Sequence, residues 1–345
     1  MKGKNVLLGI ILFFQTATIT AYSQAPEKPL KESIREYLLT QQISGSVLVV
    51  HHDEVLFNEG VGLADRNHVT PNLPTTTFPI GSITKAMVAV CIMQLQETGK
   101  LSVNEPLSNY LPEFPNSRKI KLRNLLYHTS GIPSLQIGVG YQKPIDIVNK
   151  TAKRPSEFSP GTGWGYNDLN YLMLGVIIEK ITKEPLHQYI KKNIFKRASM
   201  YHSGFITEND QTPYTSKGYV RVANHYLPAK RLNTAMLFSC GDIYSTPYDL
   251  YLFDRALMSG RLVSKNSLKQ MLTPGSKSKY GMGLYINDNG AYSRGVLSGW
   301  ETLHVYFHNE MIIVILLNVR DKGTNIHKLS RDIYEKVNLS LNLPD

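Results

Sequence analysis

Ser82 and Lys85 lie three residues apart at the start of an apolar segment, and together they could serve as a nucleophile and its base. Every side chain between Lys85 and Gln94 is apolar, which predicts a helix buried on all of its faces. An unpaired ammonium is costly to bury, so Lys85 must be paired or must lose its proton, and a neutral amine is a base. Ser82 would lie on the same helix face one turn earlier, where the helix dipole favours negative charge on an attacking oxygen. The plainer alternative, in which Ser82 caps the helix and Lys85 reaches solvent, stays open on this spacing alone.

Strand patterns at both ends of the chain predict the framework that positions this segment. Residues 46–50 are apolar after Ser46 and largely β-branched, and the apolar run 311–317 is uninterrupted, so we expect both to be buried strands. Helices are expected over about 30–41 and 325–339. The helix that carries the serine and lysine should end at Gly99, since glycine commonly follows the last helical turn.

This order of elements predicts an α/β (α+β) fold. An antiparallel sheet would be built from both ends of the chain and flanked by helices, with an all-helical subdomain inserted in the middle. The sheet part would include about 26–98 and 240–345, and the insertion about 99–239. Ser82 would then lie in the cleft between the two parts. With 345 residues and 42% hydrophobic side chains, the chain is long enough for one such domain.

The first residues have the pattern of a secretory signal peptide, 1–25. Lys2 and Lys4 precede the apolar run 6–14, and small and polar residues lead to a cleavage site after Ala25. The apolar run is too short for a membrane span, which needs about 20 residues. We therefore expect a secreted, periplasmic protein of the bacterial envelope, with no transmembrane span after cleavage.

Several classes of function are disfavoured by composition and spacing. The formal net charge is +11, but the basic residues are dispersed, so nucleic acid is not an expected partner. His304 and His308 are four residues apart in an expected strand, and no cluster has the spacing of metal ligands, so we expect neither a metal nor a cofactor. Cys91 and Cys240 lie among apolar or small residues, so we expect both to be small buried side chains. A disulfide between them is possible but not required. A monomer acting on a small molecule or a peptide is expected.

Three stretches carry a resemblance to a known family. Residues 78–85, 99–112 and 125–133, the last of which is Leu-Leu-Tyr-His-Thr-Ser-Gly-Ile-Pro, resemble the class C β-lactamase and DD-peptidase (penicillin-binding protein-like) family of serine hydrolases. The match continues through nearly the whole mature chain. Residues 158–175 resemble the second motif of that family, Tyr-x-Asn in a loop before a helix.

The resemblance implies a role for two residues of the second motif. Tyr166 would face the Ser82–Lys85 pair and shuttle a proton from the nucleophile to the leaving group. Asp168 stands where the family has Asn as a partner of substrate and lysine. A carboxylate still accepts a hydrogen bond from Lys85, but it cannot donate one to a substrate carbonyl, and its charge would hold the lysine protonated more strongly.

The third motif departs further from the family. The family places Lys or His, a small residue and Gly on a strand, six residues before a Gly-aromatic pair. Counting back from Gly299 gives Ser293, Arg294 and Gly295, with no Lys or His at the first position. Arg294 could supply the missing cation, or it could point to the opposite face of the strand and be solvated, and both alternatives stay open.

The resemblance also implies an oxyanion hole and a structural histidine. Gly295 would leave room for substrate backbone, and the N–H groups of Val296 and Ser82 would bind the oxyanion. His128 precedes Thr-Ser-Gly and invites comparison with a Ser-His-Asp triad, but Gly-x-Ser-x-Gly is absent. The family uses this stretch to pack the active-site wall, so we expect His128 to be structural.

Together these features predict an exported serine hydrolase that cleaves an amide or ester through an acyl-Ser82 intermediate. A D-Ala-D-Ala carboxypeptidase-like or related peptide or ester hydrolase is the leading interpretation. A class C-like β-lactamase or carboxylesterase is one alternative, and a catalytically weakened penicillin-binding envelope protein is another. Because the third motif lacks its cation, weak β-lactam hydrolysis is expected.

Overall fold

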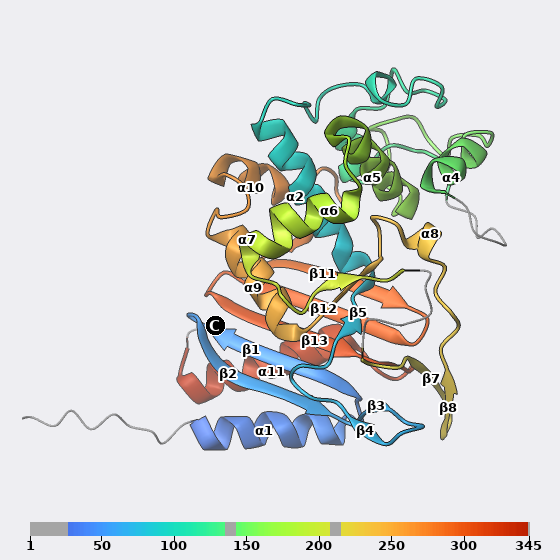
Figure 1. Cartoon of the computed structure of the whole chain (residues 1–345). Coiled ribbons are helices and arrows are strands. Elements are labelled where there is room, and N and C mark those ends of the chain that lie inside the picture. Colours follow the sequence, from blue (N-terminus) through green and yellow to red (C-terminus); the bar gives the residue numbers. More distant parts are fainter. Residues whose placement is uncertain (1–26, 135–142, 208–214, 344–345) are drawn as a thin grey trace, which may run out of the picture.

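The computed structural model describes residues 27–134, 143–207 and 215–343. The expected signal peptide, 1–25, lies outside these residues. A six-stranded sheet with helices on both faces forms one part of the molecule, and a mainly helical part lies beyond one of those faces (Figure 1). No helix within the described ranges is both long and apolar enough to cross a membrane.

The large sheet joins the two ends of the chain. Its strand order is β10-β11-β12-β13-β1-β2, and all of its strand pairs are antiparallel. Every residue of β13 (Met311–Leu317) and β1 (Gly45–His51) is buried, and the two strands pair from Gly45 opposite Leu317 to His51 opposite Met311. The expected sheet built from both termini is therefore confirmed. The other strands are β2 (Glu54–Val61), β10 (Tyr285–Asn287), β11 (Gly290–Leu297) and β12 (Trp300–Phe307).

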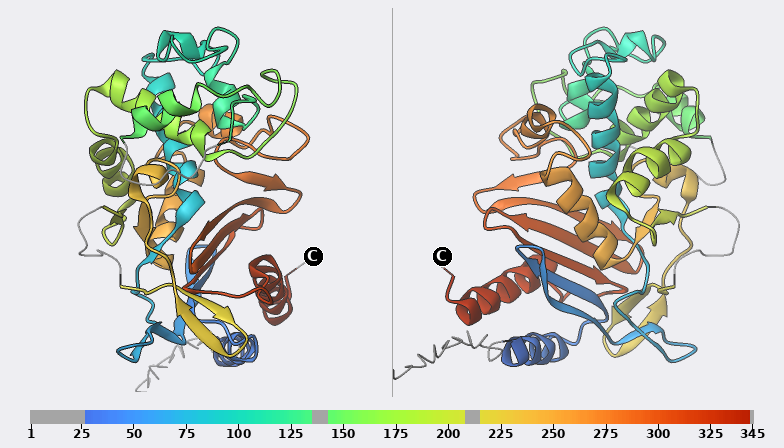
Figure 2. Two further views of the ribbon diagram at one scale, coloured as in Figure 1. Left: turned by 90° about the vertical axis from the view of Figure 1, so that its right-hand side faces the viewer. Right: turned by 60° about the vertical axis from the view of Figure 1, so that its left-hand side comes forward.

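Helices cover the two faces of this sheet differently (Figure 2). The terminal helices α1 (Glu27–Thr40) and α11 (Ile326–Leu341) pack on one face, where Leu30, Ile34 and Ile333 meet Val47, Val49 and Ile313. The other face packs against α2 (Thr84–Glu97) and α9 (Pro247–Met258) and merges with the core of the helical part. The alternation of side chains along each strand separates the two cores, because successive residues point to opposite faces.

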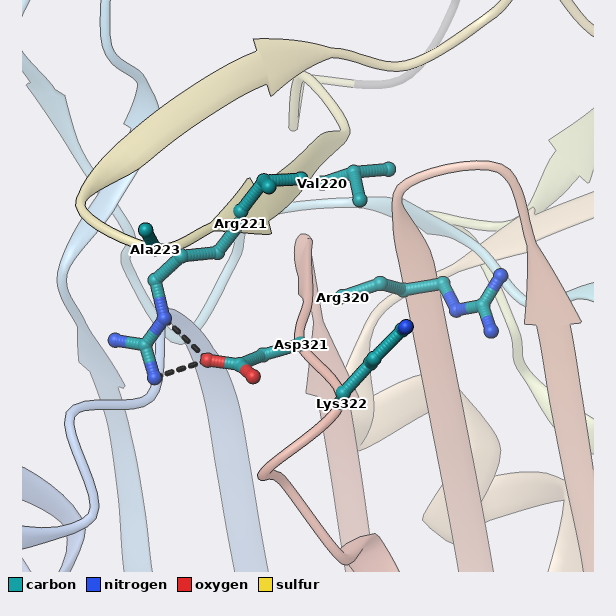
Figure 3. A pocket seen from close by; sticks show the side chains of 7 residues that line it. Val220, Arg221, Ala223, Arg320, Asp321 and Lys322 are labelled. Atoms are coloured by element: carbon teal, nitrogen blue, oxygen red, sulfur yellow. Dashed lines mark hydrogen bonds and ion pairs between the residues drawn. The ribbon is translucent and has the colours of Figure 1, made fainter.

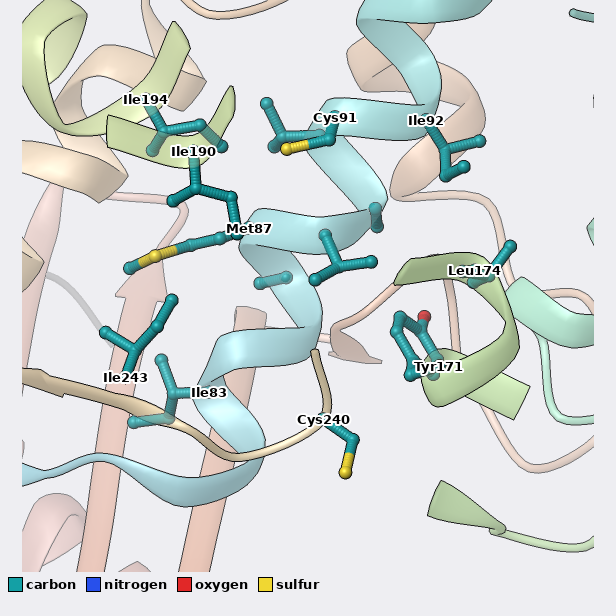
Figure 4. Packing of buried hydrophobic residues seen from close by; sticks show 14 of the residues in the cluster. Ile83, Met87, Cys91, Ile92, Tyr171, Leu174, Ile190, Ile194, Cys240 and Ile243 are labelled. Carbon is teal, nitrogen blue, oxygen red and sulfur yellow. The ribbon is translucent and has the colours of Figure 1, made fainter. Parts of the chain in front are cut away.

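Helix α2 runs from the sheet into the helical part and is buried from Thr84 to Leu95. Figure 4 shows it with Ile190 and Ile194 on one side and Tyr171 and Leu174 on the other. A 3-10 turn, η1 (Gly81–Ile83), precedes the helix, so Ser82 lies in a tighter turn than the α-helical start that its spacing predicts. The helix ends before Gly99, whose φ of +68° is the left-handed conformation expected of a terminating glycine.

The inserted part contains short strands in addition to helices. Strands β6 (Gly204–Phe205), β7 (Tyr219–Val222) and β8 (His225–Pro228) fall within 99–239, the range expected to be all-helical. The reason is long-range pairing: β7 pairs in parallel with β14 (Val319–Arg320), and β6 pairs with β9 (Ile243–Ser245). The remaining elements are β3 (Leu63–Asp65), β4 (Thr70–Pro71), β5 (Phe78–Pro79), η2 (Leu107–Asn109), α3 (Leu122–Leu126), α4 (Pro144–Thr151), α5 (Asp168–Thr182), α6 (Leu186–Ile190), η3 (Lys191–Phe195), α7 (Lys196–Ala198), α8 (Thr234–Leu237) and α10 (Lys265–Met271).

Candidate active site

Ser82 and Lys85 are in hydrogen-bond contact. The Lys85 Nζ donates to the Ser82 Oγ over 2.9 Å, as the three-residue spacing predicts. Lys85 is fully buried, whereas Ser82 is partly exposed in the turn that precedes α2. The pair is thus built by the 3-10 turn η1 and the first turn of α2, with the serine partly exposed and the lysine buried.

Three acceptors surround the Lys85 amine. Besides the serine hydroxyl, the Cys240 carbonyl oxygen lies 2.8 Å from Nζ and the Asp168 Oδ1 lies 2.8 Å from it. An ammonium has three N–H donors, so this set matches the charged form of the lysine. Burial is the largest single influence and disfavours the charged form, but Asp168, Tyr166 and Cys240 together favour it, so the pKa of Lys85 lies above its usual value.

The start of α5 positions Asp168. Asn167 caps this helix, because its side chain accepts a hydrogen bond from the Leu169 N–H, and its amide donates to the carbonyls of Ile132 and Pro133. Asp168 is the first residue of the helix, where a negative charge is favoured. Its side chain is 45% exposed, so the carboxylate contacts both Lys85 and solvent.

Tyr166 lies beside the same amine and is held by His128. The Lys85 Nζ is 5.0 Å from the centre of the Tyr166 ring, and the His128 ring is 4.4 Å from it. The N–H of Gly165 donates to the His128 carbonyl, and the N–H of Asn167 donates to the His128 Nδ1, so both neighbours of Tyr166 in the chain are anchored. The tyrosine is partly exposed, with its ring between the amine and solvent.

His128 is completely buried and is not arranged as a catalytic base. Its Nδ1 faces the side-chain amide of Asn170 at 3.0 Å, and its Nε2 has no hydrogen-bond partner among the described residues. Burial, together with the nearby Lys85 cation, holds the pKa of His128 well below its usual range. A neutral histidine packed under Tyr166 agrees with the structural role expected for it.

The third-motif strand, β11, presents no cation to Ser82. The Ser293 side chain is buried, and its hydroxyl donates to the Gly283 carbonyl over 2.8 Å. Arg294 points to the opposite face of the strand, where its guanidinium donates twice to the Glu301 carboxylate, at 2.9 and 2.6 Å. Of the two alternatives for Arg294, the geometry therefore favours the outward one.

The end of β11 packs tightly against the turn that carries Ser82. A Cβ on Gly295 would lie 1.9 Å from the Ile80 carbonyl oxygen, so only glycine fits there. A Cβ on Gly81 would lie 3.2 Å from the Val296 nitrogen, which brings that N–H group to the turn next to Ser82. The Val296 nitrogen therefore lies close to the turn that carries Ser82.

Two features of the site and its support are absent from the sequence prediction. The Cys240 carbonyl contacts Lys85 from 155 positions away, and the Cys240 and Cys91 thiols themselves are buried and unpaired. His304 and Asp254 form a second buried pair between β12 and α9, with both carboxylate oxygens 2.8 Å from the histidine Nδ1. The sequence features that could have predicted this pair are a histidine inside an apolar strand and an aspartate in a mostly apolar helix, since each needs a partner when buried. Across the three described ranges, no group of three or more metal-ligating side chains is present.

The fold, together with a buried lysine in contact with a serine, is typical of serine hydrolases with the β-lactamase fold. Comparisons with known proteins assign the chain to the same class. The sequence profile of the Beta-lactamase family matches residues 30–333, so the chain belongs to this family. It is 38% identical over 311 residues to PbpX of Bacillus subtilis (strain 168), whose name assigns it to the penicillin-binding proteins; the alignment covers 89% of this chain and 78% of PbpX. It is also 28% identical to the teichoic acid D-alanine hydrolase of Staphylococcus aureus (strain MRSA252), over 86% of this chain and 75% of the relative.

Solved structures share the fold. FmtA from Staphylococcus aureus superposes with a TM-score of 0.81 at 26% identity, covering 90% of each chain. A D-amino acid amidase from Ochrobactrum anthropi SV3 superposes with a TM-score of 0.79 over 91% of this chain and 99% of the amidase, but at 19% identity this likeness shows the fold alone. The chain is therefore a hydrolase of the β-lactamase fold, as its sequence predicts.

Proposed function

We propose that the chain is an exported hydrolase in which Ser82 attacks the carbonyl carbon of a D-alanyl ester or amide. Lys85, once neutral, would accept the serine proton, and Tyr166 would carry a proton to the leaving alcohol or amine. The N–H groups of Ser82 and Val296 would bind the oxyanion. Water would then hydrolyse the acyl-Ser82 intermediate to the free acid.

The observation that carries the substrate class is the third-motif strand. β-Lactams and D-Ala-D-Ala peptides both have a carboxylate next to the scissile bond, and the family's Lys or His helps to hold it. Here Ser293 donates to the Gly283 carbonyl and Arg294 is paired with Glu301 on the other face. This arrangement favours a D-alanyl ester, which has no carboxylate next to the scissile bond, over a β-lactam, and the S. aureus relative is named for teichoic acid D-alanine hydrolysis.

The test compares kcat/KM for a D-alanyl glycerol ester, a D-Ala-D-Ala peptide and nitrocefin. We expect the wild type to prefer the ester. In Ser293→Lys, a charged hydrogen bond to the substrate carboxylate should raise the values for peptide and nitrocefin by roughly 10- to 150-fold. Arg294→Ala is the matched control on the same strand and should change none of the three. Efficient nitrocefin turnover by both the wild type and Arg294→Ala would refute the argument from the missing cation.

Ser82→Ala separates turnover from binding. Loss of hydrolysis of all three substrates in this variant would support the nucleophile. If the wild type hydrolyses none of them but is labelled by a fluorescent penicillin at Ser82, the chain is a penicillin-binding envelope protein instead.

Export belongs to the same proposal. Lys2, Lys4 and the apolar run 6–14 support removal of residues 1–25 in a bacterial host. Mass spectrometry of the mature protein should find a chain that begins near Pro26, and an intact Met1 would contradict export by this route.

A further inference from the structure

A pocket of about 390 Å³ lies outside the site described above, between strand β7 and the segment that begins with β14. Figure 3 shows its lining from close by. Three basic side chains and one acidic side chain line it, together with small apolar ones. Its lining residues are Val220, Arg221, Val222, Ala223, Arg320, Asp321 and Lys322.

The single carboxylate of the pocket is already engaged. The Asp321 Oδ2 is paired with the Arg221 guanidinium, and its Oδ1 accepts from the Gly323 N–H over 2.7 Å. The Arg320 and Lys322 side chains extend away from this pair (Figure 3). Neither has an ion-pair partner within the described part of the chain, and the Arg320 Nε is buried without an acceptor.

The pocket is linked to the turn between β11 and β12 through the root of the β7–β8 hairpin. Gly218, which precedes β7, packs on the Trp300 ring so closely that a Cβ would come within 2.8 Å of it. After β8, the Lys230 N–H donates to the Ser298 hydroxyl over 3.0 Å. Ser298 follows β11 directly and lies two residues beyond Val296. The hairpin therefore begins at the turn beside the candidate oxyanion hole.

We propose that this pocket binds a phosphodiester group of an anionic polymer whose D-alanyl esters Ser82 hydrolyses. A guanidinium and an ammonium without carboxylate partners are the donors that phosphate prefers, and an arginine can bind two of its oxygens at once. The apolar side chains of Val220, Val222 and Ala223 offer contacts for the carbon atoms of the polyol. The inference rests on the proposed function, since the polymer held here carries the ester that is cleaved.

The binding experiment uses Ser82→Ala full-length mature protein, so that hydrolysis cannot change the ligand. Titration calorimetry measures the dissociation constant of a glycerol-phosphate oligomer, first alone and then with inorganic phosphate as competitor. The double variant Arg320→Gln/Lys322→Gln should weaken oligomer binding by at least about tenfold, the equivalent of one charged hydrogen bond. It should also reduce the dependence of binding on salt, because two cations that neutralise phosphates are gone.

A matched control removes the same charge elsewhere. Lys265 and Lys269 are exposed on α10, which Figure 1 shows far from the β7–β8 hairpin. The control Lys265→Gln/Lys269→Gln should leave the dissociation constant within about twofold, since only net charge has changed. Equal weakening in both double variants, or none in the pocket variant, would overturn the proposal. Competition by inorganic phosphate at the same concentration as the oligomer would assign the site to free phosphate and would also overturn it.

Kinetics in the catalytically intact protein separate this proposal from the proposed function. The pocket variant should raise KM for the D-alanylated oligomer and leave kcat/KM for a phosphate-free D-alanyl glycerol ester unchanged. If the wild type hydrolyses neither substrate, the proposed function fails, while the binding result still decides the pocket. If the pocket variant loses activity on the phosphate-free ester as well, the residues act on the fold or the site and the pocket proposal is wrong.

Discussion

Two side-chain pairs join elements of the molecule, Lys85 of α2 with Asp168 of α5 and His304 of β12 with Asp254 of α9, and they differ in their access to solvent. In the pair of Lys85 and Asp168, the lysine is 0% exposed and the aspartate 45%. In the pair of His304 and Asp254, the two side chains are 2% and 1% exposed. The first lies at the candidate active site, and the second joins strand β12 to helix α9.

The difference in access indicates a difference in use. His304 and Asp254 have almost no exposed surface and join β12 to α9, so we expect this pair to hold α9 on the sheet. A pair that is open on one side can respond when a substrate replaces water beside the carboxylate. In the proposed mechanism, the buried lysine would then lose a proton and accept the proton of Ser82.

Lys85→Ala should have the largest effect. Removing the amine takes away the base and leaves Asp168 without its cation, and loss of a general base typically costs about 10²–10⁴-fold in rate. We expect acylation by a fluorophosphonate probe to fall by this factor, and further than in Tyr166→Phe, which keeps the lysine. Stopped-flow measurement of the acylation rate checks both variants.

The control for that experiment is Lys85→Met, which preserves most of the side-chain volume. If Lys85→Met acylates at the wild-type rate, the lysine is a packing residue and the open pair is not catalytic. A folded Lys85→Met protein that is not acylated would support the comparison.

His304→Ala should act on stability instead of chemistry. The substitution leaves the Asp254 carboxylate buried without its partner, and breaking a buried pair in this way costs about 3–5 kcal/mol. Urea unfolding should show this loss, while kcat/KM of the protein that remains folded should stay close to the wild type. His308, four residues along and exposed, provides the control: His308→Ala should change the free energy of unfolding by less than about 0.5 kcal/mol. A variant at His304 with unchanged stability but lost activity would reverse the assignment of the two pairs.

The contrast between the pairs also marks what the sequence could predict. Ser82 and Lys85 contact each other because of their three-residue spacing, which is a local property of a helix or 3-10 turn. The contact of His304 with Asp254 spans 50 positions and depends on how α9 crosses the sheet. Such a contact follows from tertiary packing, for which a single sequence offers only the hint that a buried polar residue needs a partner.

The third-motif strand shows the same limit at shorter range. Strand alternation predicts that Arg294 points away from its neighbours, but it cannot tell which face meets the active site. The packing of Gly295 against Ile80 decides this, and with it the pairing of Arg294 with Glu301. The strands of the insertion were missed for a similar reason. β7 and β8 are only four residues each, and β7 pairs with β14 about 100 positions later, so the sequence around them did not reveal strands within the range expected to be all-helical.

Asp168→Asn should produce the smallest change and the sharpest test of the open pair. The carboxylate of Asp168 raises the pKa of Lys85, so the neutral amine that accepts the Ser82 proton forms only as pH rises. Removing that negative charge lowers the pKa, and the rising limb of the kcat/KM profile should move to lower pH. Whereas the rate rises with pH, the contribution of Lys85 to the free energy of unfolding falls. Protonated Lys85 stabilises the wild type below the unfolded pKa of about 10.4, and this contribution is lost as pH rises through the pKa of the folded state.

In Asp168→Asn the stability lost at alkaline pH should accordingly be smaller than in the wild type. Asp146→Asn is the matched control, because Asp146 is also in the first turn of a helix and is exposed, yet it lies on α4 and has no contact with Lys85. Its pH profile should coincide with that of the wild type. A rising limb that stays in place in Asp168→Asn would mean that the lysine does not have to lose a proton, and the base would then have to be sought at Tyr166, whose ring lies 5.0 Å from the same amine.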